Sequence, residues 1–101
     1  MKTVAIFRTF IDGGEVIAYF PEIPADRSGN LCMSYQHMGQ YGAASCYKNP
    51  DTRPSTKEEV DALAKELHEL GHDLEIRKRF SQEMDRKRHK CFTSPYNHST
   101  T

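Results

Sequence analysis

The chain has 101 residues, and its 14 lysine and arginine residues balance its 14 aspartate and glutamate residues, so its formal net charge is zero. A neutral chain has no overall electrostatic attraction to nucleic acids or to anionic membranes. It has no apolar run of about 20 residues, which argues against a membrane-spanning helix. The apolar stretch before Arg8 is too short for a signal peptide. We therefore expect a single cytoplasmic domain with no membrane partner.

The three cysteines, Cys32, Cys46 and Cys91, are odd in number and lie far apart in the sequence. A disulfide framework in a small secreted domain uses an even number of cysteines. We therefore expect reduced thiols, which agrees with a cytoplasmic location. A lone cysteine is usually a small buried apolar side chain, and none of the three is assigned a catalytic role.

A β-hairpin is predicted at the start of the chain. Residues 3–11 and 15–20 are rich in β-branched and aromatic side chains, and an Asp-Gly-Gly triplet lies between them at residues 12–14. An Asp-Gly pair supplies the positive φ that a tight hairpin turn needs. The second strand is expected to end before Pro21 and Pro24, because proline cannot donate a hydrogen bond to a strand ladder.

One or two further strands are expected in the middle of the chain. Residues 31–38 are a candidate third strand, and residues 43–47 a candidate short fourth strand. Residues 25–30 are polar, and residues 48–54 are polar and contain two prolines, which is typical of loops.

A helix is predicted to begin at Ser55 or Thr56. Each is followed three residues later by a glutamate, Glu58 or Glu59, which is the capping-box spacing. Gly71 favours a left-handed end to the helix. The apolar residues of the predicted helix recur at three- and four-residue spacing and form one stripe, which comprises Val60, Leu63, Ala64, Leu67 and Leu70.

A last strand is predicted at residues 74–80, with Leu74, Ile76 and Phe80 on its buried face. Residues 82–101 are interpreted as a polar basic tail that is largely disordered. The chain is therefore predicted to be one α+β domain over residues 1–81. The helix would pack across one face of the sheet, because this arrangement buries the apolar stripe and a sheet face together.

The least apolar part of the predicted sheet is the segment from Ser34 to Gly42. Tyrosine and histidine combine an apolar body with a hydrogen-bonding tip, which suits a recognition surface. Glycine allows another backbone to approach closely. The alternative is an edge strand whose polar side chains face water. The interaction patch that we predict from this segment consists of Tyr35, Gln36, His37, Gln40 and Tyr41.

Residues 68–72 read His-Glu-Leu-Gly-His, which resembles the HExxH signature of zinc metallopeptidases. In a zinc site of this type, His68 and His72 would bind the metal and Glu69 would act as the general base. A rotation of about 100° per residue places all three away from the apolar stripe, toward solvent. If the helix ends at Gly71, His72 lies beyond its last turn. We therefore interpret the motif as incidental and expect neither a metal nor another cofactor. The third ligand of such a site would come from Glu83, His89 or His98.

The neutral total conceals two oppositely charged segments. Residues 57–75 carry a net charge of −5, and residues 76–91 carry a net charge of +5. The basic segment lies near aromatic residues and could bind phosphates and bases, although it could equally pair with the acidic helix or be solvated. The candidate nucleic-acid contacts are Arg77, Arg79, Arg86, Lys87 and Arg88.

Three stretches of the chain together resemble a family of short uncharacterised proteins from bacterial, phage and plasmid genomes. The stretches are residues 7–18, residues 32–40 and the Thr-Arg-Pro triplet at residues 52–54. The resemblance covers residues 4–80, and no activity or site residue is carried over by it. In that family an aromatic residue often follows the helix-ending glycine, where His72 stands here. The resemblance implies an accessory protein of a mobile element, which would bind host machinery such as a defence system.

The sequence thus predicts a non-enzymatic binding or regulatory protein that docks on a host macromolecule, with a host protein as the expected partner. The docking surface would be the polar strand, a sheet edge or the acidic helix, and strand addition is one binding mode. The first alternative is a nucleic-acid-binding protein that uses residues 77–90. The second is a zinc-dependent hydrolase that uses residues 68–72. The sequence does not assign an oligomeric state.

Overall fold

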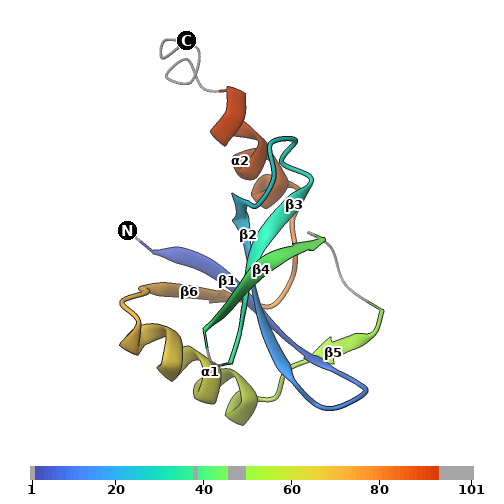
Figure 1. Ribbon diagram of the computed structural model, residues 1–101, viewed down its shortest axis with the longest axis vertical. Coiled ribbons are helices and arrows are strands. Elements are labelled where there is room, and N and C mark those ends of the chain that lie inside the picture. The colour runs from blue at the N-terminus through green and yellow to red at the C-terminus, as the bar shows by residue number, and fades with distance from the viewer. Residues whose placement is uncertain (1, 38, 46–49, 94–101) are drawn as a thin grey trace.

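A computed structural model describes residues 2–37, 39–45 and 50–93 of the chain (Figure 1). The predicted ends of two strands, at residues 38 and 46–47, lie outside these residues, as do Cys46 and the segment 94–101 of the predicted tail. No helix in the described ranges is long and apolar enough to cross a membrane. The elements follow in the order β1 (Thr3–Phe10), β2 (Val16–Pro24), β3 (Leu31–Gln36), β4 (Gln40–Ser45), β5 (Thr52–Pro54), α1 (Lys57–Glu69), β6 (Leu74–Arg77) and α2 (Gln82–Thr93).

The strands form one mixed six-stranded sheet in which β1 holds a central place. On one side of β1 the antiparallel strands β2, β3 and β4 follow in order. The other side of β1 is shared by two short strands. Strand β5 pairs antiparallel with Arg8–Phe10, and β6 pairs parallel with Thr3–Ile6. The predicted α+β class is confirmed, as is the hairpin of β1 and β2.

Both faces of the sheet carry an apolar cluster. Side chains alternate between the faces along each strand. One cluster includes Phe7 and Phe20 from the sheet and Leu63 and Leu67 from α1. The other cluster comprises Val4, Ile6, Ile17, Tyr19, Cys32 and, from α2, Met84. Helix α1 therefore covers one face as predicted, and α2 covers part of the other. The two helices lie at opposite ends of the long axis of the molecule (Figure 1).

Helix α1 begins at the second of the two candidate caps. The Thr56 hydroxyl accepts a hydrogen bond from the Glu59 N–H at 3.3 Å, and Glu59 Oε1 accepts from the Thr56 N–H at 2.8 Å. These two bonds form a complete capping box. At the other end, Gly71 has a φ of +98°, and the N–H groups of residues 71 and 72 bond to the carbonyls of His68 and Leu67. This pattern is a Schellman motif, so the predicted glycine stop is confirmed.

Four details of the predicted strands are wrong. Strand β4 begins at Gln40 rather than at residue 43, and it runs through Gly42. Strand β2 continues through Pro21 to Pro24, because a register shift against β3 interrupts the ladder between Phe20 and Pro24 and removes the need for a regular N–H donor there. A short strand, β5, lies inside the predicted loop 48–54. The final strand stops at Arg77, and Ile76, a predicted buried residue, is 47% exposed on this edge strand.

The apolar stripe of α1 is shorter than predicted. Leu63, Ala64 and Leu67 are buried and Val60 packs against them, but Leu70 is 54% exposed. Leu70 is the C-cap residue of the helix, where the chain turns away from the sheet toward β6.

The largest difference from the sequence-based prediction is helix α2, which occupies residues 82–93 of the predicted tail. Its buried anchor is Arg88, which is only 3% exposed. The guanidinium donates hydrogen bonds to the backbone carbonyls of Gly29, at 2.6 Å, and Pro21, at 2.7 Å, and it also contacts the Asp85 carboxylate at 2.8 Å. The sequence signal for this helix is weak because its residues 82–90 contain one apolar side chain, that of Met84, which lies in the core. The folded part of the chain therefore extends beyond residue 81.

Replacement of Arg88 by alanine should lower the free energy of unfolding by about 2–4 kcal/mol, because it leaves buried carbonyls without their donor. Arg86→Ala is the matched control, since Arg86 is exposed on the same helix, and should change stability by less than about 0.5 kcal/mol. Urea unfolding followed by circular dichroism measures both. Equal, small effects of the two substitutions would show that α2 is not docked on the sheet.

Candidate functional site

The β3–β4 hairpin forms one end of the sheet. Within the described residues, β4 pairs with β3 and with no other strand, so it is an edge strand. Most of its side chains are exposed, and its sequence, Gln-Tyr-Gly-Ala-Ala-Ser, contains neither a charged residue nor a proline. Alternate backbone groups of an edge strand point away from the sheet and are available to another strand. The alternative prediction for this segment, an edge strand with polar side chains in water, therefore describes β4 better than β3.

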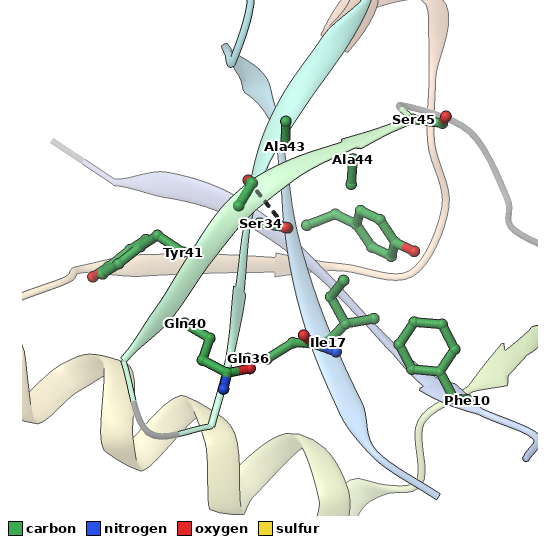
Figure 2. Close-up of a pocket in the computed structure, with 11 residues that line it drawn as sticks. Phe10, Ile17, Ser34, Gln36, Gln40, Tyr41, Ala43, Ala44 and Ser45 are labelled. Atoms are coloured by element: carbon green, nitrogen blue, oxygen red, sulfur yellow. Dashed lines mark hydrogen bonds between the residues drawn. The ribbon is translucent and has the colours of Figure 1, made fainter. Parts of the chain in front are cut away.

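A shallow groove of about 480 Å³, the sheet-face groove, lies beside β4 on the sheet face that α2 partly covers. Phe10 and Ile17 provide apolar surface, and the Ser34 hydroxyl, which lines the groove, donates to the Gly42 carbonyl at 3.1 Å (Figure 2). The small side chains of Gly42 and Ala43 leave the groove accessible from the edge.

A second groove of about 740 Å³, the acidic groove, lies between α1 and the turn ends of the two hairpins. Apolar residues Val16, Ala62 and Leu63 line it, together with polar residues of the β3–β4 hairpin. Its carboxylates come from the β1–β2 turn and from α1, and they belong to Glu15, Glu58, Glu59 and Glu66.

The predicted interaction patch divides between these two grooves. Gln36 and Gln40 line both grooves, and His37 lines the acidic groove. Tyr41 is 48% exposed, lines the sheet-face groove from the edge, and projects from β4 away from Phe10 and Ile17 (Figure 2). Its hydroxyl lies 2.7 Å from His72 Nε2.

The fifth residue of the predicted patch, Tyr35, is not on the surface. It is 1% exposed and belongs to the apolar cluster under α1, because its position in β3 points to that face. Its hydroxyl donates to the Glu66 carboxylate and accepts from the Gly39 N–H at 3.0 Å. Burial, together with the hydrogen bond to Glu66, raises the pKa of Tyr35, so this phenol remains a donor. The other carboxylate oxygen of Glu66 contacts His37 Nδ1, and α1 is thereby tied to the hairpin.

The HELGH segment continues past the end of α1. Helix α1 ends at Glu69, so His72 lies beyond its last turn, as predicted, and the two histidines are not one helical turn apart. His68 and Glu69 are exposed as expected. His72 is not directed into solvent, which corrects the prediction, because its ring stacks on Phe20 with a centroid distance of 5.8 Å. Among the described residues, no group of three or more His, Cys, Asp and Glu side chains is arranged to hold a metal ion.

The five candidate nucleic-acid contacts do not form one open basic surface. Arg88 is buried and anchors α2, so its assignment as a phosphate contact is wrong. Arg77 pairs with Glu75, and Lys87 lies within 3.7 Å of carboxylate oxygens of Glu22 and Glu83. The remaining two, Arg79 and Arg86, are exposed.

A polar network fixes the start of α1 beside the acidic groove. The Arg53 guanidinium contacts both carboxylate oxygens of Glu59 at 2.9 Å, and Thr9 Oγ1 donates to Oε1 of the same carboxylate at 3.0 Å. The hydrogen bonds from Arg53, followed by the Thr56 N–H, lower the pKa of Glu59 to about 2. Glu59 is therefore ionised at neutral pH, and its charge is compensated by Arg53.

Comparisons of the chain with protein-family models, with curated proteins and with solved structures found no match. The site is therefore defined by geometry alone. Sequence reasoning missed the contributions of Phe10 and Ile17 to one groove and of Glu15 and Glu58 to the other. Nothing in the sequence shows that these distant residues meet, because the meeting depends on the strand order.

Replacement of Tyr35 by phenylalanine should lower the free energy of unfolding by about 1–2 kcal/mol, because the partly buried Glu66 carboxylate and the Gly39 N–H lose their shared partner. The control is Tyr41→Phe. The hydroxyl of Tyr41 is on an exposed side chain, and its removal should lower stability by less than about 0.5 kcal/mol. Chemical denaturation measures both variants. An equal or larger effect at Tyr41 would contradict the buried role given to Tyr35.

Arg53→Met should raise the pKa of Glu59 from about 2 toward the ordinary value of 4.5. In the native protein the folded pKa lies below the unfolded one, so the ionised carboxylate stabilises the fold above pH 4.5, and this contribution is lost as the pH falls toward 2. The variant should lose less stability over that interval. A carboxyl NMR titration of Glu59, with Glu58 as the internal reference, measures the shift. An unchanged Glu59 pKa in the variant would exclude Arg53 as its cause.

Proposed function

We propose that this protein is a non-enzymatic binding protein that docks on a partner protein by accepting an extended segment of the partner along β4. The observation that carries the proposal is the outer edge of the six-residue strand β4, where no other described strand pairs between Gln40 and Ala43 and which is uncharged and free of proline. Strand addition uses main-chain hydrogen bonds for affinity, so an edge of this kind is sufficient to bind a partner segment.

The opposite edge of the sheet differs from β4 in strand length, in proline content and in charge. It is divided between β5, of three residues, and β6, of four residues. Strand β5 ends at Pro54, and β6 carries the Glu75–Arg77 ion pair. Short strands, proline and charge are the features that protect sheet edges from pairing with other chains. One edge is therefore protected and the other is open, which supports β4 as the docking edge.

The sheet-face groove beside β4 supports the same proposal. An added strand would direct alternate side chains toward this face of the sheet. There they would first meet the β4 residues Gln40 and Gly42, which also line the groove, with Ile17 and Phe10 further in on β2 and β1. Main-chain pairing would give affinity, and the fit of these side chains would give specificity.

The resemblance of residues 4–80 to short proteins of bacterial, phage and plasmid genomes supports a bacterial host protein as the partner. Within this proposal, occupation of an edge that the partner needs for its own assembly would inhibit that partner, and a component of a host defence system is the candidate class. The exposed residues Arg79 and Arg86 do not favour nucleic acid as a second candidate, because the other three predicted contacts are paired or buried.

The test introduces charge at the edge without disturbing the core. Gly42 has space for a side chain, since an added Cβ would meet only Ser34 Oγ at 3.8 Å, and Ala43 is exposed. The double variant Gly42→Lys/Ala43→Lys should lower the recovery of a captured bacterial partner about tenfold, equivalent to about 1.4 kcal/mol.

The matched control is Ile76→Lys on the opposite, protected edge, which should recover the partner as the native protein does. Affinity capture from a bacterial lysate, quantified by mass spectrometry, compares the three baits after thermal unfolding has shown that all are folded. Recovery of the same proteins by the β4 variant and the native chain, or of none above background, would exclude the proposal.

A further inference from the structure

We infer that the acidic groove binds an extended segment of a partner protein that carries arginine or lysine side chains. This site shares Gln36 and Gln40 with the sheet-face groove beside β4, but binding there does not depend on strand addition. Three properties of the groove support this inference: two carboxylates from different elements that form no ion pair in the described residues, three apolar side chains in the lining, and the amide side chains of Gln36 and Gln40.

The charge of the groove is only partly neutralised by the protein itself. Glu59 is compensated by Arg53, and Glu66 contacts His37 and Tyr35. Glu15, from the β1–β2 turn, and Glu58, from the first turn of α1, form no ion pair in the described part of the chain, and both side chains are exposed. A cation in the groove would therefore find carboxylates that have not already been paired.

The apolar part of its lining distinguishes the groove from a merely acidic surface. Val16, Ala62 and Leu63 line it together with the carboxylates. Arginine and lysine have long methylene stems that pack on apolar surface while their charged ends reach polar groups. A small inorganic cation has no apolar part to pack on these residues, whereas a basic side chain would contact the apolar residues with its stem and the carboxylates with its charged end. Gln36 and Gln40 supply amides that can bond the backbone of the segment.

The basic segment of a second copy fits the groove less well than a partner segment. Its residues 82–93 are helical rather than extended. Arg88 is buried, and Arg77 and Lys87 already have carboxylate neighbours. The groove has a volume of about 740 Å³, which matches a short extended stretch with one or two basic side chains better than the flank of a helix.

The probe is a blocked peptide of sequence Gly-Arg-Gly-Arg-Gly, titrated into isotope-labelled full-length protein and followed by amide chemical shifts. The control peptide replaces both arginines with citrulline, which keeps the methylene stem of the side chain and removes its charge. We expect saturable shifts at residues 14–16, 36–40 and 58–66 with the arginine peptide, and a dissociation constant about tenfold weaker with the citrulline peptide.

Two double variants, each of which removes two negative charges, test whether the peptide binds in the groove. Glu15→Gln/Glu58→Gln removes the unpaired carboxylates of the groove and should weaken arginine-peptide binding about tenfold. Asp61→Asn/Glu69→Gln removes the same charge from exposed positions of α1 that do not line the groove, and it should leave binding within about twofold.

Equal weakening by the two pairs would show general electrostatic attraction and would overturn the inference, as would the absence of saturable binding. Concentration-dependent shifts of the groove residues without peptide would assign the groove to a second copy and would also overturn it. None of these outcomes bears on the β4 edge, which the lysate capture tests separately.

Discussion

The structure depends on the burial of β1 on both faces. Every residue from Val4 to Thr9 is buried. A strand covered on both sides carries apolar residues at consecutive positions rather than in alternation, as the Val-Ala-Ile-Phe run does here. Each face then requires its own cover, which α1 supplies on one side and α2 on the other. The two polar exceptions, Arg8 and Thr9, are satisfied by Thr52 of β5 and by the residues that start α1.

This constraint determines where the molecule can interact with others. The short strands β5 and β6 protect the side of β1 that they flank, and the helices occupy the faces around it. The β3–β4 hairpin lies at the far end of the sheet, where one edge stays open and a groove adjoins it. The bond network of Tyr35, Glu66 and His37 joins this hairpin to α1 and so holds the walls of the acidic groove. Both proposed contacts therefore follow from incomplete cover of the same end of the sheet.

The sequence predicted the elements whose signals are local. The turn at residues 12–14, the capping box and the glycine stop each rest on a few adjacent residues, and all appear in the structure. Strand β5 and helix α2 were missed because their stability is supplied by tertiary contacts. Strand β5 is three residues long, and α2 is anchored by a buried arginine that looks like a surface residue in the sequence. Four of the five residues of the predicted interaction patch line the two grooves, but the strand alternation that buries Tyr35 became visible only with the register of β3 against β2.

The central claim is that the edge of β4 is open in the isolated protein, and native-state hydrogen exchange tests it most directly. Outward-facing amides of an unpaired edge strand have no acceptor and exchange rapidly, whereas amides paired with β3 are protected. The Tyr41 N–H donates to the Gly39 carbonyl at 3.2 Å, so the outward-facing amide that tests the claim is that of Ala43, two residues further along β4. We predict rapid exchange at Ala43, beside uniformly slow exchange in the middle of β1. Uniform protection of the β4 amides at the level of β1 would mean that the edge is already covered, and it would contradict the account.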